Sequence, residues 1–147
     1  MLLALLTSGC AARTSAVGLL QIDEGAPVLL RDAEMDLKLR PGKRSEAIPY
    51  LGGCTVDVSG PQLGRTVWVR DWSVVTAYDG SEPFVGVVGR VNGMLALDDR
   101  NSGSVFLLEE DSAAPLVSYE GELVLVMGFV VGPQLLQIMG YRVLGPD

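Results

Sequence analysis

The apolar residues of this chain fall in short runs that are separated by turns rich in glycine, proline and aspartate. Residues 35–40 alternate strictly, with apolar side chains at 35, 37 and 39 and charged side chains between them. Such a period of two is typical of a β-strand with one buried and one solvated face. Residues 123–131 form a further strand-length run, apolar everywhere except at Gly128. The pattern predicts a mainly β protein.

The pattern occurs twice along the chain. Gly53 and Gly60 of the first half correspond to Gly121 and Gly128 of the second, at an offset of 68 residues in both cases (53 to 121, 60 to 128). A fixed period of this size indicates one supersecondary unit that is used twice. We therefore predict a first repeat at residues 15–76 and a second at residues 83–144, joined by a short turn.

Each repeat has the same predicted order of elements: three strands, a short helix and two more strands. The first repeat has strands at 17–22, 27–31, 35–40, 55–58 and 65–75, with helical turns at 45–51 for which Ser45 is the expected N-cap. The second has strands at 84–90, 94–97, 105–108, 123–131 and 135–144, with a short helix within 109–118. This order resembles the OB-fold, a five-stranded Greek-key barrel with a helix between its third and fourth strands. The resemblance implies two tandem five-stranded OB-like barrels, each with one short helix, although SH3-like and other small barrels also fit the pattern.

The repeats differ on one face of the fourth strand. Positions 55, 57 and 59 are polar in the first repeat, whereas their equivalents in the second are Leu123, Leu125 and Met127. An apolar strip of this kind is seldom left exposed. We expect the first repeat or a partner protein to cover these three residues, which makes them candidate partner-binding residues.

The charge of the chain limits its function. Net charge is −7 over 147 residues, with no histidine, and residues 79–147 carry the whole imbalance with ten acidic and three basic side chains. Nucleic-acid binding needs clustered Lys and Arg, so this composition argues against nucleic acid as a general partner. The absence of histidine removes the commonest general base and metal ligand, and no nucleophile motif is present. We predict neither catalytic residues, nor a metal site, nor a cofactor, and therefore no enzyme.

Two polar or reactive features have structural interpretations. Asp98 and Asp99 belong to an oxygen-rich stretch, but its spacing does not match a Ca²⁺ loop and favours an ordinary turn. Cys54 is expected to be a free, partly buried thiol, with a disulfide to Cys10 as the alternative.

The N-terminus is an apolar run, MLLALL, followed by small residues and Cys10. The run is too short to span a bilayer and is typical of the end of a secretory signal. Ser8, Gly9 and Cys10 resemble the lipobox of bacterial lipoproteins, although Thr7 stands where leucine is usual and no basic n-region precedes the run. The resemblance implies a signal peptide at 1–9, a lipidated Cys10, a tether at 10–14 and an outer-membrane location facing the periplasm. The alternative is a short apolar strand or a frayed terminus.

One aromatic and basic patch could bind a ligand. Trp68 and Trp72 flank Arg70, and aromatic rings beside arginine can stack on bases or sugars. The alternative is that one or both rings fill a barrel or the junction between the repeats. Our leading hypothesis is an envelope lipoprotein that acts as a non-enzymatic binding and scaffold module within an envelope protein complex. The second is an OB-type binder of single-stranded nucleic acid or oligosaccharide that uses this patch.

Overall fold

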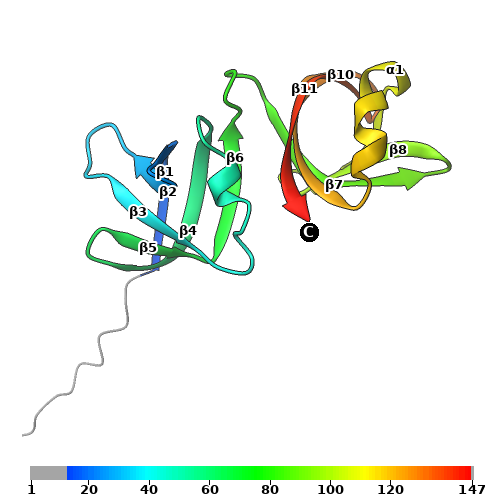
Figure 1. The fold of residues 1–147 in the computed structure, drawn as a ribbon. Helices are drawn as coiled ribbons and strands as arrows, with labels where there is room; N and C mark the ends of the chain where they lie inside the picture. Colours follow the sequence, from blue (N-terminus) through cyan, green and yellow to red (C-terminus); the bar gives the residue numbers. More distant parts are fainter. Residues whose placement is uncertain (1–12, 147) are drawn as a thin grey trace, which may run out of the picture.

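The computed structural model describes residues 13–146, which form two β-barrels in tandem (Figure 1). The predicted signal segment and Cys10 lie outside this range. The first barrel contains β1 (Arg13–Asp23), β2 (Ala26–Leu30), β3 (Leu37–Pro41), the 3₁₀ helix η1 (Ile48–Tyr50), β4 (Thr55–Leu63), β5 (Thr66–Val69) and β6 (Asp71–Thr76). The second contains β7 (Pro83–Val91), β8 (Met94–Asp99), β9 (Val105–Leu108), α1 (Glu110–Ala113), η2 (Ala114–Tyr119), β10 (Glu122–Gly132) and β11 (Leu135–Pro146).

Both barrels close with the same strand order. The first runs β1-β2-β3-β5-β4 and is closed by the pairing of β1 with β4, while β6 continues the course of β5 beyond Arg70. The second runs β7-β8-β9-β11-β10 and is closed by the pairing of β7 with β10. In each barrel the third and last strands run parallel and the other pairs antiparallel. The predicted fold of two tandem OB-like barrels is therefore confirmed.

The predicted repeat equivalence is visible at its glycines. A Cβ on Gly60 would lie 1.9 Å from the carbonyl oxygen of Trp68, and a Cβ on Gly128 would lie 2.1 Å from that of Gln137. Both contacts are with backbone, which cannot move aside as a flexible side chain could. Glycines 68 residues apart thus occupy equivalent positions in the two barrels, where two strands approach too closely for any side chain.

Each barrel has its own apolar interior. Val56 and Val58 of β4 and their equivalents Val124 and Val126 of β10 are all buried there, as the alternation predicts. The short helices close one end of each barrel, where Ile48 of η1 and Leu116 of η2 are fully buried. The interior is therefore built in the same way in both repeats.

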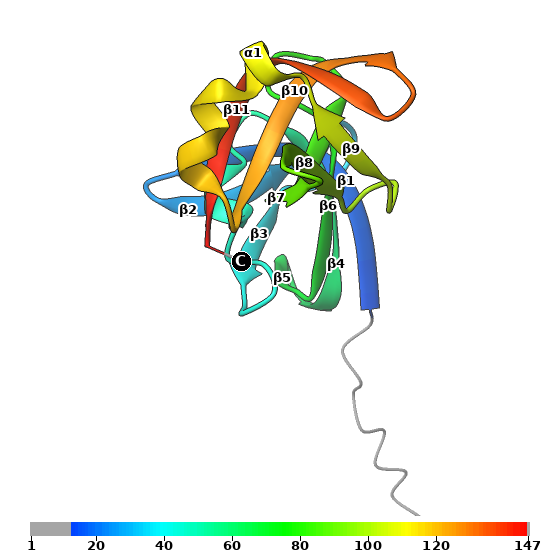
Figure 2. The same cartoon turned by 90° about the vertical axis from the view of Figure 1, so that its right-hand side faces the viewer.

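A continuous apolar seam joins the two barrels. Val85, Leu125 and Leu144 of the second barrel belong to the same buried cluster as the core of the first, and Leu123 packs against that cluster. Full burial of a side chain of this size is worth about 1.5–3 kcal/mol. The seam therefore holds the two barrels in one arrangement, seen from a second side in Figure 2.

Polar contacts border the apolar seam. The Arg142 guanidinium donates to the carbonyl oxygens of Tyr50 (3.0 Å) and Gly52 (2.9 Å) at the end of η1. On the other side, the Asn101 amide donates to the carbonyl oxygen of Val74 (3.1 Å). These bonds link side chains of β11 and of the β8–β9 loop in the second barrel to backbone carbonyls of the first, and they fix how the barrels are rotated against each other.

Two local predictions need correction. Arg13 and Thr14, expected in the tether, already belong to β1, because they pair with Pro61 and Gly60 of β4. Ser45 does not cap η1: the residue at that position is Ala47, without a side-chain cap. The Ser45 hydroxyl makes other hydrogen bonds, which are important for the site described next.

Candidate functional site

The two tryptophans of the predicted patch have different environments. Trp68 lies on β5 with 37% of its surface exposed, and the Arg40 guanidinium lies 5.9 Å from the centre of its ring. Trp72 lies on β6 and is only 4% exposed, with its indole N–H donating to the carbonyl oxygen of Arg44 at 3.0 Å. Trp72 is therefore part of the core beside the seam, and only Trp68 presents a face to solvent.

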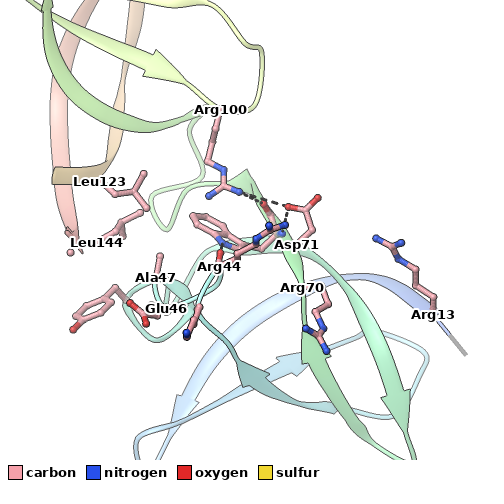
Figure 3. Close-up of a pocket in the computed structure, with 13 residues that line it drawn as sticks. Arg13, Arg44, Glu46, Ala47, Arg70, Asp71, Arg100, Leu123 and Leu144 are labelled. Carbon is pink, nitrogen blue, oxygen red and sulfur yellow. Dashed lines mark hydrogen bonds and ion pairs between the residues drawn. The ribbon is translucent and has the colours of Figure 1, made fainter. Parts of the chain in front are cut away.

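A pocket of about 710 Å³ opens between the barrels, next to Trp72. Its charged lining comes mainly from the first barrel (Figure 3). A smaller hollow adjoins it, shares Lys43, Arg44 and Arg70 with it, and extends to Arg40 and Trp68. We call the basic residues of the two hollows the basic surface: Arg13, Arg40, Lys43, Arg44, Arg70 and Arg100.

The basic surface concentrates positive charge in an acidic protein. It holds six of the eleven Lys and Arg residues of the chain, and only Glu46 and Asp71 contribute carboxylates to its lining. Asp71 lies 3.8 Å from Arg100 and also accepts from the backbone N–H of Trp72 at 2.9 Å. The surface therefore keeps a clear excess of positive charge.

The loop that carries Lys43 and Arg44 is fixed from within. The buried Ser45 hydroxyl accepts from the backbone N–H of Gly42 at 2.7 Å and donates to the carbonyl oxygen of Val69 at 3.1 Å. The Trp72 indole holds the carbonyl of Arg44, as described above. Two buried side chains thus position the two cations beside Arg70 without contacting their charged groups.

Arg100 joins the second barrel to this surface. It follows β8, and its guanidinium carbon lies 3.9 Å from the centre of the Trp72 ring. One guanidinium nitrogen also donates to the carbonyl oxygen of Trp72 at 3.3 Å. A cation over a tryptophan face is attracted by the ring quadrupole. The pocket is therefore formed by both barrels and depends on their docking.

The apolar strip of β10 is covered mainly by the seam. We expected the first repeat or a partner protein to cover this strip. Leu125 is fully buried in the cluster shared with the first repeat, and Leu123 is partly buried against the same cluster. Met127 is also buried, but its methyl group lies over Gly140 of its own barrel. Leu125 and Met127 are therefore not available to an external partner, whereas Leu123 is partly exposed and lines the pocket between the barrels.

Cys54 and Asp99 have structural environments. Cys54 is a free thiol with no exposed surface, more buried than expected, and its burial raises its pKa although the nearby Arg142 charge acts in the opposite direction. The Asp99 carboxylate accepts from the Val85 N–H at 3.1 Å and the Ser102 hydroxyl at 2.7 Å, which fixes the turn after β8. Over residues 13–146 no group of three or more acidic, histidine or cysteine side chains could hold a metal ion.

The sequence pattern identified Arg70 of the basic surface and the adjoining Trp68, but none of the other five basic residues. Lys43 and Arg44 are the only adjacent basic pair in the chain, which was the available signal. Arg13 and Arg100 are far from them in sequence, and only the fold brings them together. No helix within the described part of the chain is long and apolar enough to cross a membrane.

The comparisons with known proteins add no assignment: no protein-family model matches the chain, and no curated protein matches it.

Proposed function

We propose that this chain is a lipoprotein of the bacterial cell envelope whose two OB-like barrels serve as a non-enzymatic binding and scaffold module. The observation that carries the proposal is the seam, which joins two small barrels into one platform through shared core residues and through hydrogen bonds from the second barrel to backbone carbonyls of the first. A unit of about 60 residues is marginally stable alone, so docking also stabilises each barrel. The lipobox-like Ser8-Gly9-Cys10 supports a lipid anchor in the outer membrane, with the barrels in the periplasm.

The anchor is tested on the protein in its own membranes. We expect the mature N-terminal peptide to begin at Cys10 and to carry the mass of two or three acyl chains. We also expect Cys10→Ser to move the protein out of the membrane fraction. Retention of Met1 in the mature protein would refute the anchor.

The scaffold proposal requires a partner-binding surface, and the β10–β11 hairpin is the best candidate. Phe129 is 59% exposed, Met139 is 67% exposed, and Val130 and Val131 are also exposed. Residues 79–147, which include the second repeat, carry the whole net charge of −7, so the complementary partner is an envelope protein with an apolar patch bordered by basic side chains.

A photo-cross-linking residue at position 129, introduced in cells, tests this surface. We expect one discrete adduct that is lost in Val131→Asp. The matched control is the same cross-linker at position 17, because Val17 is also exposed (50%) but lies on β1 of the first barrel. Identical adducts from both positions would contradict a specific partner surface.

A second candidate function is binding of single-stranded nucleic acid or oligosaccharide. Its support is the exposed face of Trp68 with Arg40 beside it, next to the hollow lined by Lys43, Arg44 and Arg70. Stacking on one tryptophan contributes about 1–3 kcal/mol per base. We expect single-stranded nucleic acid to bind weakly, because the net charge of −7 repels its phosphates. Tight, salt-sensitive binding to single-stranded DNA that is lost in Trp68→Ala would favour this function over the scaffold.

A further inference from the structure

We propose that the basic surface binds the headgroups of anionic phospholipids and thereby orients the barrels on the membrane that anchors them. This inference rests on the proposed lipid anchor for its geometry, but its chemistry can be tested without the lipid. Its starting point is the concentration of six cations in two adjoining hollows of a chain that is acidic overall.

The cations on the first barrel have no competing partner. Over residues 13–146, the side chains of Arg13, Lys43, Arg44 and Arg70 take part in no hydrogen bond and no ion pair, whereas Arg31 and Arg90 pair with Glu34 and Glu120. All four are exposed at the pocket, and buried contacts hold the loop that carries two of them. An unpaired, pre-positioned group of guanidinium and ammonium ions is suited to phosphate oxygens.

The position of Arg13 identifies the source of the phosphate. Arg13 follows Cys10 by three residues, which span at most about 11 Å even when fully extended. That distance is close to one Debye length at physiological ionic strength, roughly 8 Å. A lipid on Cys10 therefore keeps this member of the basic surface within the electrostatic range of the headgroups.

Two exposed apolar side chains accompany the cations. Leu63, at the end of β4, is 70% exposed, and it lies two residues beyond Pro61, which pairs with Arg13. Trp68 lies on the next strand and lines the smaller hollow. The beginning of β1 lies beside the β4–β5 hairpin in both views (Figures 1 and 2). Tryptophan is enriched at membrane–water interfaces, so a half-exposed ring among cations fits this environment.

The test uses the full chain as Cys10→Ser, which removes the lipid, in co-sedimentation with vesicles of phosphatidylcholine with or without phosphatidylglycerol. We expect binding to the vesicles that contain phosphatidylglycerol and a loss of that binding as salt is raised. Each Lys or Arg near an anionic surface contributes about five-fold in affinity, so Lys43→Gln/Arg44→Gln is expected to weaken it roughly 25-fold. The apolar residues 1–9 act equally on both kinds of vesicle and cancel in the comparison.

The matched control is Arg31→Gln/Arg90→Gln, which removes the same charge from side chains outside the basic surface. We expect this control to bind vesicles as the parent does. We expect Lys43→Gln/Arg44→Gln to keep the parent's melting temperature, because both side chains are exposed at the pocket. Equal binding to both kinds of vesicle, or equal losses in both double variants, would overturn the proposal. So would tight binding to single-stranded DNA with no binding to vesicles.

The acylation state of Cys10 in cells tests the lipid anchor independently of the vesicle experiment. If Cys10 is found unmodified in cells while the vesicle binding depends on Lys43 and Arg44, the lipid anchor fails and the basic surface stands. If Cys10 is acylated and the unlipidated chain ignores phosphatidylglycerol, the anchor stands and the surface proposal fails.

Discussion

Replacing Leu125 by aspartate tests the seam directly, because aspartate is the residue that the first repeat carries at the equivalent position, 57. Leu125 is fully buried in the cluster that the two barrels share. Losing its burial costs about 1.5–3 kcal/mol. A carboxylate at this site must either lose its hydration or force the barrels apart, and both cost further free energy. The value for lost burial is therefore a lower bound on the destabilisation. For a chain of this length the loss corresponds to a fall in melting temperature of roughly 5–9 °C.

The measurement is thermal unfolding followed by circular dichroism, with small-angle scattering to report whether the barrels separate. The matched control is Val130→Asp, the same chemical change on the same strand at an exposed position. We expect the control to unfold within about a degree of the parent, since surface substitutions are usually within 0.5 kcal/mol. Equal melting temperatures and equal scattering for parent and Leu125→Asp would show that the seam does not hold the barrels together.

Three further outcomes follow from local geometry. Gly128→Ala places a Cβ on a backbone oxygen of β11 and should lower the denaturant midpoint, whereas Gly89→Ala meets open space and should not. Arg142→Ala, with the other cysteine replaced by serine, should speed the reaction of Cys54 with a thiol reagent. The Arg142 charge lowers the pKa of the Cys54 thiol, so removing Arg142 raises that pKa and by itself slows labelling. Faster labelling would therefore report that the seam has opened. Glu109 is the N-cap of α1, and hydrogen bonds from Ser112 lower the pKa of its carboxyl group. The stability that this carboxylate contributes is present above its unfolded-state pKa and is lost as pH falls through its folded-state pKa. Its replacement by glutamine should flatten that part of the stability–pH curve.

Strand pattern and repeat spacing predicted the fold because each is a local consequence of the barrel. A strand with one buried face has to alternate, and a crossing too tight for a Cβ has to be glycine, as at Gly60 and Gly128. Comparison of the two repeats also located the seam, since Leu125 replaces Asp57 at a position where the barrel itself needs no apolar residue. The same local pattern was wrong at Met35, which was expected on the buried face of a strand at 35–40: β3 begins at Leu37, and Met35 is 55% exposed.

The basic surface was only partly predictable because it depends on contacts between distant segments. Arg13 and Arg70 line one pocket only because β1 pairs with β4 and the β3–η1 loop folds back onto β5. The prediction that Ser45 caps the helical turns failed for the same reason. Its hydroxyl bonds Val69, 24 residues away, instead of the helix that follows it, and no local pattern encodes that choice.

Docking also accounts for the different electrostatic surfaces of two barrels built from one duplicated pattern. The second repeat has three basic residues, and two of them, Arg100 and Arg142, contact the first barrel at the seam. The third, Arg90, pairs with Glu120. The surface that the second barrel turns away from the seam is therefore left with its carboxylates, while the first barrel keeps unpaired cations beside the start of β1. Next to an anionic membrane, the first barrel is attracted and the second is repelled. A rigid seam combines these two forces into one orientation, which a flexible linker between two independent barrels would not do.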